Sequence, residues 1–250
     1  PVYFISDIHL MLDKSEKEKI RREKLFTFLR QVRSTGGTLF IVGDIFDFYF
    51  EYRDVIPKSY FDFYHELYLV KQSGVDIHYM LGNHDFWVLD FITEEITTHT
   101  YFKDTSFNIN GKTFYITHGD GHLSWDRGYR LLKSLIQSKA FIWLYRYLHP
   151  NIGYKFGKWI SKKGKHYEHD DTYNRKILND LKKFASKLTE SGTDFIICGH
   201  YHQATITDIG PGKLVILGDW LSIFTYGLFD GNEFSRSEER RVGKECRSRW

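Results

Sequence analysis

Five short segments of this 250-residue chain carry acidic, histidine and amide side chains that are able to bind metal ions. Each segment directly follows a short apolar run of the kind that forms a buried strand. The segments are Asp7-Ile8-His9, Gly43-Asp44, Gly82-Asn83-His84-Asp85, His118-Gly119-Asp120 and Gly199-His200-Tyr201-His202. Carboxylate, imidazole and amide ligands together suit divalent ions such as Mn²⁺, Fe²⁺, Zn²⁺ or Mg²⁺. The sequence therefore predicts a metal centre built from Asp7, His9, Asp44, Asn83, His118, His200 and His202.

Each segment taken alone has an ordinary structural explanation. Asp7 and His9 form a common surface pattern, Asn83 is a good helix N-cap, and His200 and His202 could lie on the exposed face of a strand. Coincidence explains five such segments poorly, because each one lies at the end of a strand. In open α/β sheets the loops beyond the carboxyl ends of the strands converge on one edge. We therefore expect the five segments to share one site.

Short strands alternating with helices are the elements that must position these side chains. Apolar runs predict strands at residues 2–5, 39–42, 77–81 and 195–198. Helical spacing of apolar residues predicts helices over residues 20–32 and 61–71. Gly43, Gly82 and Gly199 are expected to let the chain turn sharply after its strands.

Two hairpins add antiparallel strands to this pattern. The Asn110-Gly111 pair between residues 107–109 and 113–117 is typical of a type I′ turn. A second hairpin is expected around residues 210–212. Together the elements predict an α/β (α+β) fold with two mixed sheets in a sandwich, flanked by helices.

Composition indicates one folded domain followed by an unusual tail. Hydrophobic residues make up 42% of the chain, which is ample for a packed core. The chain holds 35 basic and 32 acidic residues, and residues 235–250 contribute six of the basic and three of the acidic ones. Without that segment 29 residues of each sign remain, so no nucleic-acid partner is expected from charge. We interpret residues 1–234 as the domain and residues 235–250 as a non-native tail.

Two further observations bear on where the protein works. No run of about 18 apolar residues is present, so we expect no membrane-spanning helix. Cys198 and Cys246 are too few for a disulfide scaffold, which is typical of a protein in the reducing cytosol. The sequence does not indicate an oligomeric state.

The order Asp-x-His, Gly-Asp-x-x-Asp, Gly-Asn-His-Asp, His and Gly-His-x-His resembles the calcineurin-like metallophosphoesterase superfamily. The resemblance implies a four-layer αββα sandwich and hydrolysis of a phosphoester with two metal ions, preferably Mn²⁺. The implied ligands are Asp7, His9 and His202 for one ion, Asn83, His118 and His200 for the other, and Asp44 for both. It also implies that His84 is catalytic at the phosphate, with Asp85 orienting its imidazole.

A helical cap insertion is predicted at about residues 124–170. Residues 127–166 hold ten basic residues and no acidic one, interleaved with aromatic and bulky aliphatic side chains. Because aliphatic side chains are so frequent there, we favour a cap that binds anionic lipid headgroups and acyl chains. A nucleic-acid surface, or a helical subdomain whose aromatic residues form its own core, is the alternative.

Motifs around the ligands resemble the UDP-2,3-diacylglucosamine pyrophosphatases of lipid A synthesis, most closely their Bacteroidetes-type branch. The motifs are residues 43–48, 118–121, 126–129, 148–151 and 218–220. The resemblance implies hydrolysis of UDP-2,3-diacylglucosamine to UMP and 2,3-diacylglucosamine 1-phosphate by a cytoplasmic protein resting on the inner membrane. The expected substrate contacts are Asn83, Arg53, Asp126, Tyr129, Lys158 and Lys162. Many proteobacterial members carry Arg at the position where this chain has His84, the residue of the wider superfamily.

Two other functions remain open at the level of sequence. One is a different activity of the same superfamily, such as that of a nuclease or a cyclic-nucleotide phosphodiesterase. The other is a metal-binding scaffold without catalysis, for which the usual mark is loss of a ligand or of the motif histidine. All seven ligands and His84 are present here.

Overall fold

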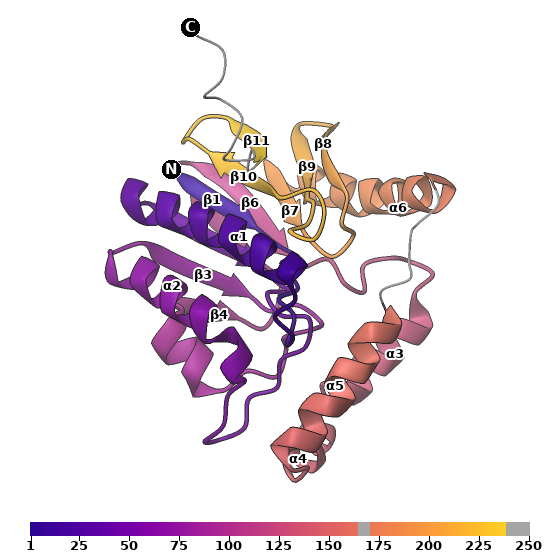
Figure 1. Cartoon of the computed structure of the whole chain (residues 1–250). Helices are drawn as coiled ribbons and strands as arrows, with labels where there is room; N and C mark the ends of the chain where they lie inside the picture. The colour runs from indigo at the N-terminus through magenta and orange to yellow at the C-terminus, as the bar shows by residue number, and fades with distance from the viewer. Residues whose placement is uncertain (165–170, 239–250) are drawn as a thin grey trace, which may run out of the picture.

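Two β-sheets packed face to face form the centre of the molecule, and helices cover both outer faces (Figure 1). This computed structural model describes residues 1–164 and 171–238, and for residues 160–164 it describes the backbone alone. The first sheet consists, in order across it, of β11 (Phe234–Glu238), β10 (Thr225–Phe229), β1 (Val2–Ile5), β2 (Thr38–Val42), β3 (Asp76–Met80) and β4 (His99–Tyr101). The second consists of β5 (Thr105–Ile109), β6 (Lys112–Thr117), β7 (Phe195–Cys198), β9 (Gly212–Leu217) and β8 (Ala204–Ile209).

Three hydrophobic layers hold the sheets and helices together. Between the sheets, Phe4 packs against Phe40 and Phe114 with ring centroids 5.1 and 5.8 Å apart. The outer face of the first sheet is covered by α1 (Glu16–Thr35) and α2 (Phe61–Gln72), and that of the second by α6 (Asp171–Glu190). The predicted four-layer sandwich is therefore confirmed.

Both sheets are mixed, as the sequence predicts. β1, β2, β3 and β4 run parallel, β10 pairs antiparallel with β1, and β11 pairs antiparallel with β10. In the β5–β6 hairpin, Asn110 and Gly111 have φ angles of 51° and 80°, and positive φ at both turn residues defines a type I′ turn. The second predicted hairpin is formed by β8 and β9.

The first sheet extends past the predicted end of the domain. β11 pairs with β10 through Glu238, so residues 235–238 belong to the sheet and the boundary predicted at residue 234 falls inside a strand. Residues 239–250 lie outside the described residues. The non-native origin of the tail stays a prediction.

Three helices between β6 and α6 form a lobe beside the sandwich (Figure 1). They are α3 (Arg127–Ile136), α4 (Lys139–Arg146) and α5 (Pro150–Gly164), at the place of the predicted cap. Hydrogen bonds to the core help to attach this cap: the Trp87 indole N–H donates to Ile136 O at 3.0 Å, and the Tyr154 hydroxyl donates to Phe50 O at 2.6 Å.

The remaining helices are short, and none of the described ones suits a bilayer. They are η1 (Lys58–Tyr60) and η2 (Phe91–Ile96), which flank α2 and β3 along the chain. Within residues 1–164 and 171–238, no helix has the length and apolarity that crossing a membrane requires.

Candidate metal centre

The predicted ligands converge beyond the carboxyl ends of the strands. Five of them lie in the left-handed region of the backbone: Asp7, His9, Asp44, His200 and His202 have φ angles of 53°, 46°, 54°, 66° and 55°. Residues other than glycine rarely adopt this conformation, and each instance costs about 1 to 3 kcal/mol. Such strain, repeated at five ligands and almost nowhere else in the described chain, is typical of a functional site.

Asp7, His9 and His202 form the first ligand group. His202 Nε2 lies 3.6 Å from Asp7 Oδ1 and 3.3 Å from His9 Nε2. Two imidazole nitrogens facing each other beside a carboxylate fit a shared cation. These three residues are the ones predicted for the first ion.

Asp44 lies between this group and a second one. Its Oδ2 atom is 3.7 Å from His9 Nε2 and 3.3 Å from His118 Nε2. His118 Nε2 is in turn 3.1 Å from Asn83 Oδ1, and His200 completes a group with Asp44 and His118. The arrangement fits the predicted second ion and the bridging position of Asp44.

Hydrogen bonds outside the two groups fix the orientation of the imidazole rings. His118 Nδ1 donates to Val42 O at 2.9 Å, which leaves its Nε2 lone pair for a metal ion. His202 Nδ1 lies 3.4 Å from Asp219 Oδ2, and Asp219 also accepts hydrogen bonds from the backbone N–H groups of residues 221–223. A carboxylate behind a ligating histidine is a common support of metal sites, so the residues present fit divalent ions.

Burial and nearby charges shift the pKa values of the ligand histidines in different directions. Burial lowers the pKa of His200 to about 3, helped by the nearby His118, and burial also lowers the pKa of His9 well below its usual value. Burial opposes the charged form of His118 as well, but the Asp44 carboxylate outweighs it and raises the pKa of His118. His9 and His200 are therefore neutral near pH 7, the state in which imidazole binds metal ions.

His84 lies at the edge of the ligand groups, with its ring 4.8 Å from that of His9. Its Nδ1 donates to the backbone oxygen of Asp47 at 2.7 Å, and its backbone N–H donates to Asp44 Oδ1 at 2.9 Å. Burial disfavours the imidazolium, yet the negative charge of Asp44 and the Asp47 hydrogen bond outweigh burial and raise the pKa of His84. The raised pKa favours the protonated form of His84, which is the form that can donate a proton.

Asp85 has a different role from the predicted one. Its buried carboxylate accepts hydrogen bonds from the backbone N–H groups of Gly82 and Ile45 at 2.8 and 2.6 Å, and it does not hold the His84 ring. Burial raises the pKa of Asp85 to about 6, with the Asp44 charge as the second cause. Asp85 therefore joins the loops after β2 and β3, and the Asp47 backbone carbonyl orients His84 instead.

The three glycines that precede ligands act in two ways. Gly43 has a φ of 81°, as a sharp turn requires. Gly82 and Gly199 do not have positive φ, which corrects the expectation that they serve to turn the chain. A Cβ atom at Gly82 would lie 2.1 Å from Asp44 Oδ1, and one at Gly199 would lie 2.7 Å from Asp7 Oδ2, so these positions must stay small.

Three residues have supporting roles that were not predicted from sequence, although Asp120 and Asp219 lie in motifs named above. Asp219 backs His202, as described above. Asp120 Oδ2 lies 2.6 Å from Lys133 Nζ and accepts a hydrogen bond from the Tyr129 hydroxyl at 2.9 Å, so it connects the centre to the cap. Arg21 is buried in α1 and donates to the backbone oxygens of Ile8 and Trp220, next to two ligand loops. Asp120 directly follows the His118-Gly119 pair, but nothing in the pattern of α1 marks Arg21.

An apolar groove of about 290 Å³ opens beside the metal centre, between the core and the cap. Asn83 and His84 lie at the end of this groove that meets the metal ligands. Its walls are Phe48, Phe50 and Trp87 from the core, and Leu132, Ile136, Phe141 and Phe156 from the cap. The groove is the feature that distinguishes this centre from a flat phosphate site.

The predicted substrate contacts fall into three sets. Asn83 and Tyr129 line the groove, and the Tyr129 ring lies 6.1 Å from that of His200. Arg53 instead lines a separate cavity with Trp143 and Arg146, and no metal ligand borders that cavity.

The other three predicted contacts lie on the cap. Asp126 is the residue at which α3 begins, and its side chain makes no capping hydrogen bond. Lys158 forms an exposed ion pair with Asp13 at 3.6 Å, so it connects the cap to the loop before α1. The side chain of Lys162 lies outside the described residues. Direct contact of these residues with substrate stays a prediction.

The chain is similar to several known proteins. The profile of the calcineurin-like phosphoesterase family matches residues 1–204. A UDP-2,3-diacylglucosamine hydrolase of Porphyromonas gingivalis is 30% identical, with 92% of this chain and 94% of that protein covered. The hydrolase of the same name from Neisseria meningitidis is 27% identical, with 88% and 90% covered. Among solved structures, an archaeal phosphodiesterase has 16% identity and a TM-score of 0.42, with 94% of this chain and 98% of that one covered.

Proposed function

Because the chain belongs to the calcineurin-like phosphoesterase family, we propose that it hydrolyses the diphosphate of UDP-2,3-diacylglucosamine with two divalent ions, preferably Mn²⁺. The products are UMP and 2,3-diacylglucosamine 1-phosphate, and the second of these is an intermediate of lipid A synthesis. Relatives that carry the name of this hydrolase align with nearly the whole chain, cap included. The alignment supports the substrate, and the donor set supports the ions.

The apolar groove at the metal centre is the observation that carries this substrate. A nucleic-acid strand or a cyclic nucleotide has little apolar surface that could pack against Leu132, Ile136 and Phe141 in the walls of the groove. An acyl chain gains about 0.8 kcal/mol for each CH₂ group that leaves water. The groove ends at Asn83 and His84, so a lipid held in it presents its phosphate to the metal ligands.

The roles of the residues follow from their contacts. Two neighbouring divalent ions activate water and neutralise the charge of phosphate oxygens. Asp44 holds the two ligand groups at a fixed separation, since its carboxylate faces both. His84 is placed by the Asp47 backbone oxygen to donate a proton to the departing phosphate oxygen. Asn83 lies at the junction of the metal centre and the groove.

The outer surface of the cap supports work at a membrane. Six large apolar residues of α3, α4 and the loop that follows are exposed and do not line the groove: Leu131, Leu135, Trp143, Leu144, Tyr147 and Leu148. Basic residues such as Lys139 and Arg146 lie on the same helix as Trp143. Apolar and cationic side chains together favour anionic lipid surfaces. We accordingly place the protein at the cytoplasmic face of the inner membrane.

The test compares three substrates with purified protein and Mn²⁺. These are UDP-2,3-diacylglucosamine, bis(p-nitrophenyl) phosphate and single-stranded DNA. We expect UMP release from the lipid substrate to be by far the most efficient reaction, because the lipid alone fills the groove. Efficient DNA cleavage without UMP release would overturn the proposed substrate while leaving the metal centre intact.

A further inference from the structure

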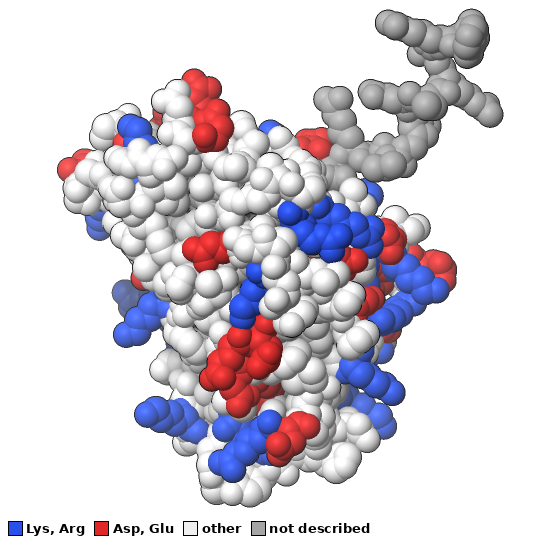
Figure 2. All heavy atoms as spheres, turned by 90° about the vertical axis from the view of Figure 1, so that its left-hand side faces the viewer, with Lys and Arg blue, Asp and Glu red and all other residues white. Residues whose placement is uncertain are grey.

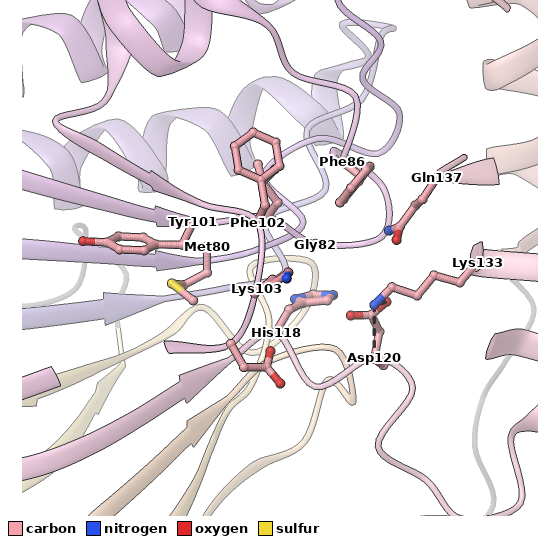
Figure 3. A pocket seen from close by; sticks show the side chains of 12 residues that line it. Met80, Gly82, Phe86, Tyr101, Phe102, Lys103, His118, Asp120, Lys133 and Gln137 are labelled. Carbon is pink, nitrogen blue, oxygen red and sulfur yellow. Dashed lines mark hydrogen bonds and ion pairs between the residues drawn. The ribbon is translucent and has the colours of Figure 1, made fainter. Parts of the chain in front are cut away.

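A second cavity reaches the metal centre at His118, and it differs in character from the apolar groove (Figure 3). Its volume is about 230 Å³, and its walls come from the loops after β3, β4 and β6 and from α3 of the cap. Cavity and groove share no lining residue. They meet the centre at His118 and Asn83, whose side chains are 3.1 Å apart, so the ligands lie between two unlike cavities.

Polar side chains in this cavity are available to a ligand. The Lys103 ammonium group and the Gln137 amide form no hydrogen bond or ion pair with any residue that the structure describes. Lys133 is instead held by Asp120 at 2.6 Å. In Figure 3 the Gln137 amide and the Lys133 ammonium group both point from the cap towards the core. The cavity therefore combines an unpaired cation with an unpaired amide.

An aromatic surface lies next to these polar groups. Phe86 and Phe102 form an edge-to-face pair with ring centroids 6.1 Å apart. Phe102 leaves 53% of its surface exposed, although it borders the cavity. Exposed aromatic rings beside cationic groups are the combination with which proteins bind a nucleobase that carries a phosphate.

From these observations we propose that the cavity binds the nucleoside half of the substrate, a uridine 5′-phosphate, while the groove binds the acylated half. The inference rests on the proposed function, which supplies a substrate with two unlike ends joined by a diphosphate. The base stacks on Phe102, Gln137 hydrogen-bonds to the polar edge of the base, and Lys103 faces the phosphate. The diphosphate then spans the ligands between His118 and Asn83.

Inhibition by UMP tests this cavity directly. The assay follows hydrolysis of bis(p-nitrophenyl) phosphate with Mn²⁺, inhibited by UMP or by inorganic phosphate. Both inhibitors carry a phosphate group, but only UMP carries the nucleoside. In Phe102→Ala and in Gln137→Ala the inhibition constant of UMP should rise about fivefold to tenfold, while that of inorganic phosphate changes less than about twofold.

Two further variants separate loss of the ring from general damage. Phe102→Leu keeps an apolar side chain and removes the ring, so it should raise the inhibition constant of UMP in the same way. Phe61→Ala is the matched control, because Phe61 is 70% exposed at the start of α2 and lines neither the cavity nor the groove. Both inhibition constants should stay at their wild-type values in that control.

The possible results test the cavity assignment and the proposed substrate separately. An unchanged UMP constant in Phe102→Ala and Gln137→Ala would overturn the cavity assignment, even if the wild-type protein releases UMP from the lipid. Absence of UMP release from the lipid would overturn the proposed function, and the UMP constants on the soluble diester would still report on the cavity. Leu132→Ala in the groove should weaken inhibition by 2,3-diacylglucosamine 1-phosphate and leave that by UMP unchanged.

Discussion

At the scale of single residues, Asp44 connects the two halves of the metal centre. One carboxylate oxygen accepts the His84 N–H, and the other faces both His9 and His118. The carboxylate is fully buried and holds its charge, since burial is outweighed by the surrounding histidines, which keep the pKa of Asp44 well below its usual range.

Replacing Asp44 by Ala should therefore abolish both metal binding and turnover. Wild-type protein should contain two Mn²⁺ ions per chain after reconstitution, measured by mass spectrometry of metal content, and the variant should contain fewer. Turnover should fall by more than about a thousandfold, because one side chain organises both ions. Kinetics near the wild-type level would contradict the bridging role.

Gly82 tests the packing around that carboxylate. In Gly82→Ala the new Cβ atom would lie 2.1 Å from Asp44 Oδ1, so the carboxylate must move. We expect a loss of activity of about a hundredfold, since a shift of about 1 Å in a catalytic group has an effect of this size. Gly128→Ala is the control, because its Cβ atom meets nothing within 4 Å and alanine favours the helix. Equal activity of the two variants would show that the loop adjusts freely.

At the scale of elements, periodicity predicts the strands that precede the ligands and the helices α1 and α2, because their buried residues are apolar, whereas β4, β11 and α6 were not predicted. The start of α1 is an exception. Ile20 is 63% exposed, while the charged residues Glu18, Arg21 and Arg22 occupy the buried face that continues to Leu25. A pattern of charged residues normally indicates a solvent face. Their burial depends on the loops that α1 supports, so it could not be predicted from the sequence of the helix.

This charged face braces the ligand loops. Arg21 pairs with Glu18 and donates to Ile8 O, and Arg22 pairs with Glu18 and donates to Met11 O at 2.8 Å. Glu18 in turn accepts the N–H of Met11 at 3.0 Å. The helix thereby fixes the segment on both sides of His9.

Arg21→Met should lower the free energy of unfolding by about 3 kcal/mol, because it removes one of the two ion-pair partners of the buried Glu18 and the donor to the backbone oxygens of Ile8 and Trp220. Chemical denaturation measures this change. The control is Arg30→Met on the exposed side of α1, where the ion pair with Glu66 at 2.9 Å should contribute less than about 1 kcal/mol. A loss at Arg21 as small as that at Arg30 would show that the brace has no energetic role.

At the scale of the whole molecule, the sequence predicts which residues form the metal centre, but it does not predict the contacts that join this centre to the surrounding loops and the cap. Strand ends in a sandwich share one edge, which is why seven ligands distant in sequence could be placed together. The partners of Asp85, Asp219 and Lys158 depend on how loops and cap pack, and the sequence carries no local signal for them. The position of Arg53 has the same origin, because it lines a cavity with Trp143 and Arg146 of α4, and its contact with substrate stays a prediction.

Charged side chains of both signs lie on the face covered by α1 and α2, among larger uncharged areas. Figure 2 shows Lys and Arg side chains there near Asp and Glu side chains. Some of them pair between the helices, as Arg30 does with Glu66. The apolar surface of the cap is therefore the more distinctive feature of the molecule, and it is the surface on which the membrane proposal depends.

Substitution of Trp143 and Trp159 tests whether the apolar surface of the cap binds lipid. Both are more than half exposed, at 61% and 53%. Their joint replacement by Ala should weaken binding to vesicles with anionic phospholipid and lower the rate on the diacylated substrate, with little effect on bis(p-nitrophenyl) phosphate. If both substrates lost activity equally, the cap would be a stabilising subdomain rather than a lipid-binding surface.

The most direct test of hydrolysis at the metal centre follows the oxygen of water. UDP-2,3-diacylglucosamine is incubated with the protein and Mn²⁺ in water enriched in oxygen-18, and both products are analysed by mass spectrometry. Attack of water on the phosphorus next to the nucleoside predicts one heavy oxygen in UMP and none in 2,3-diacylglucosamine 1-phosphate. Label in the lipid phosphate, or no UMP at all, would contradict the proposed reaction.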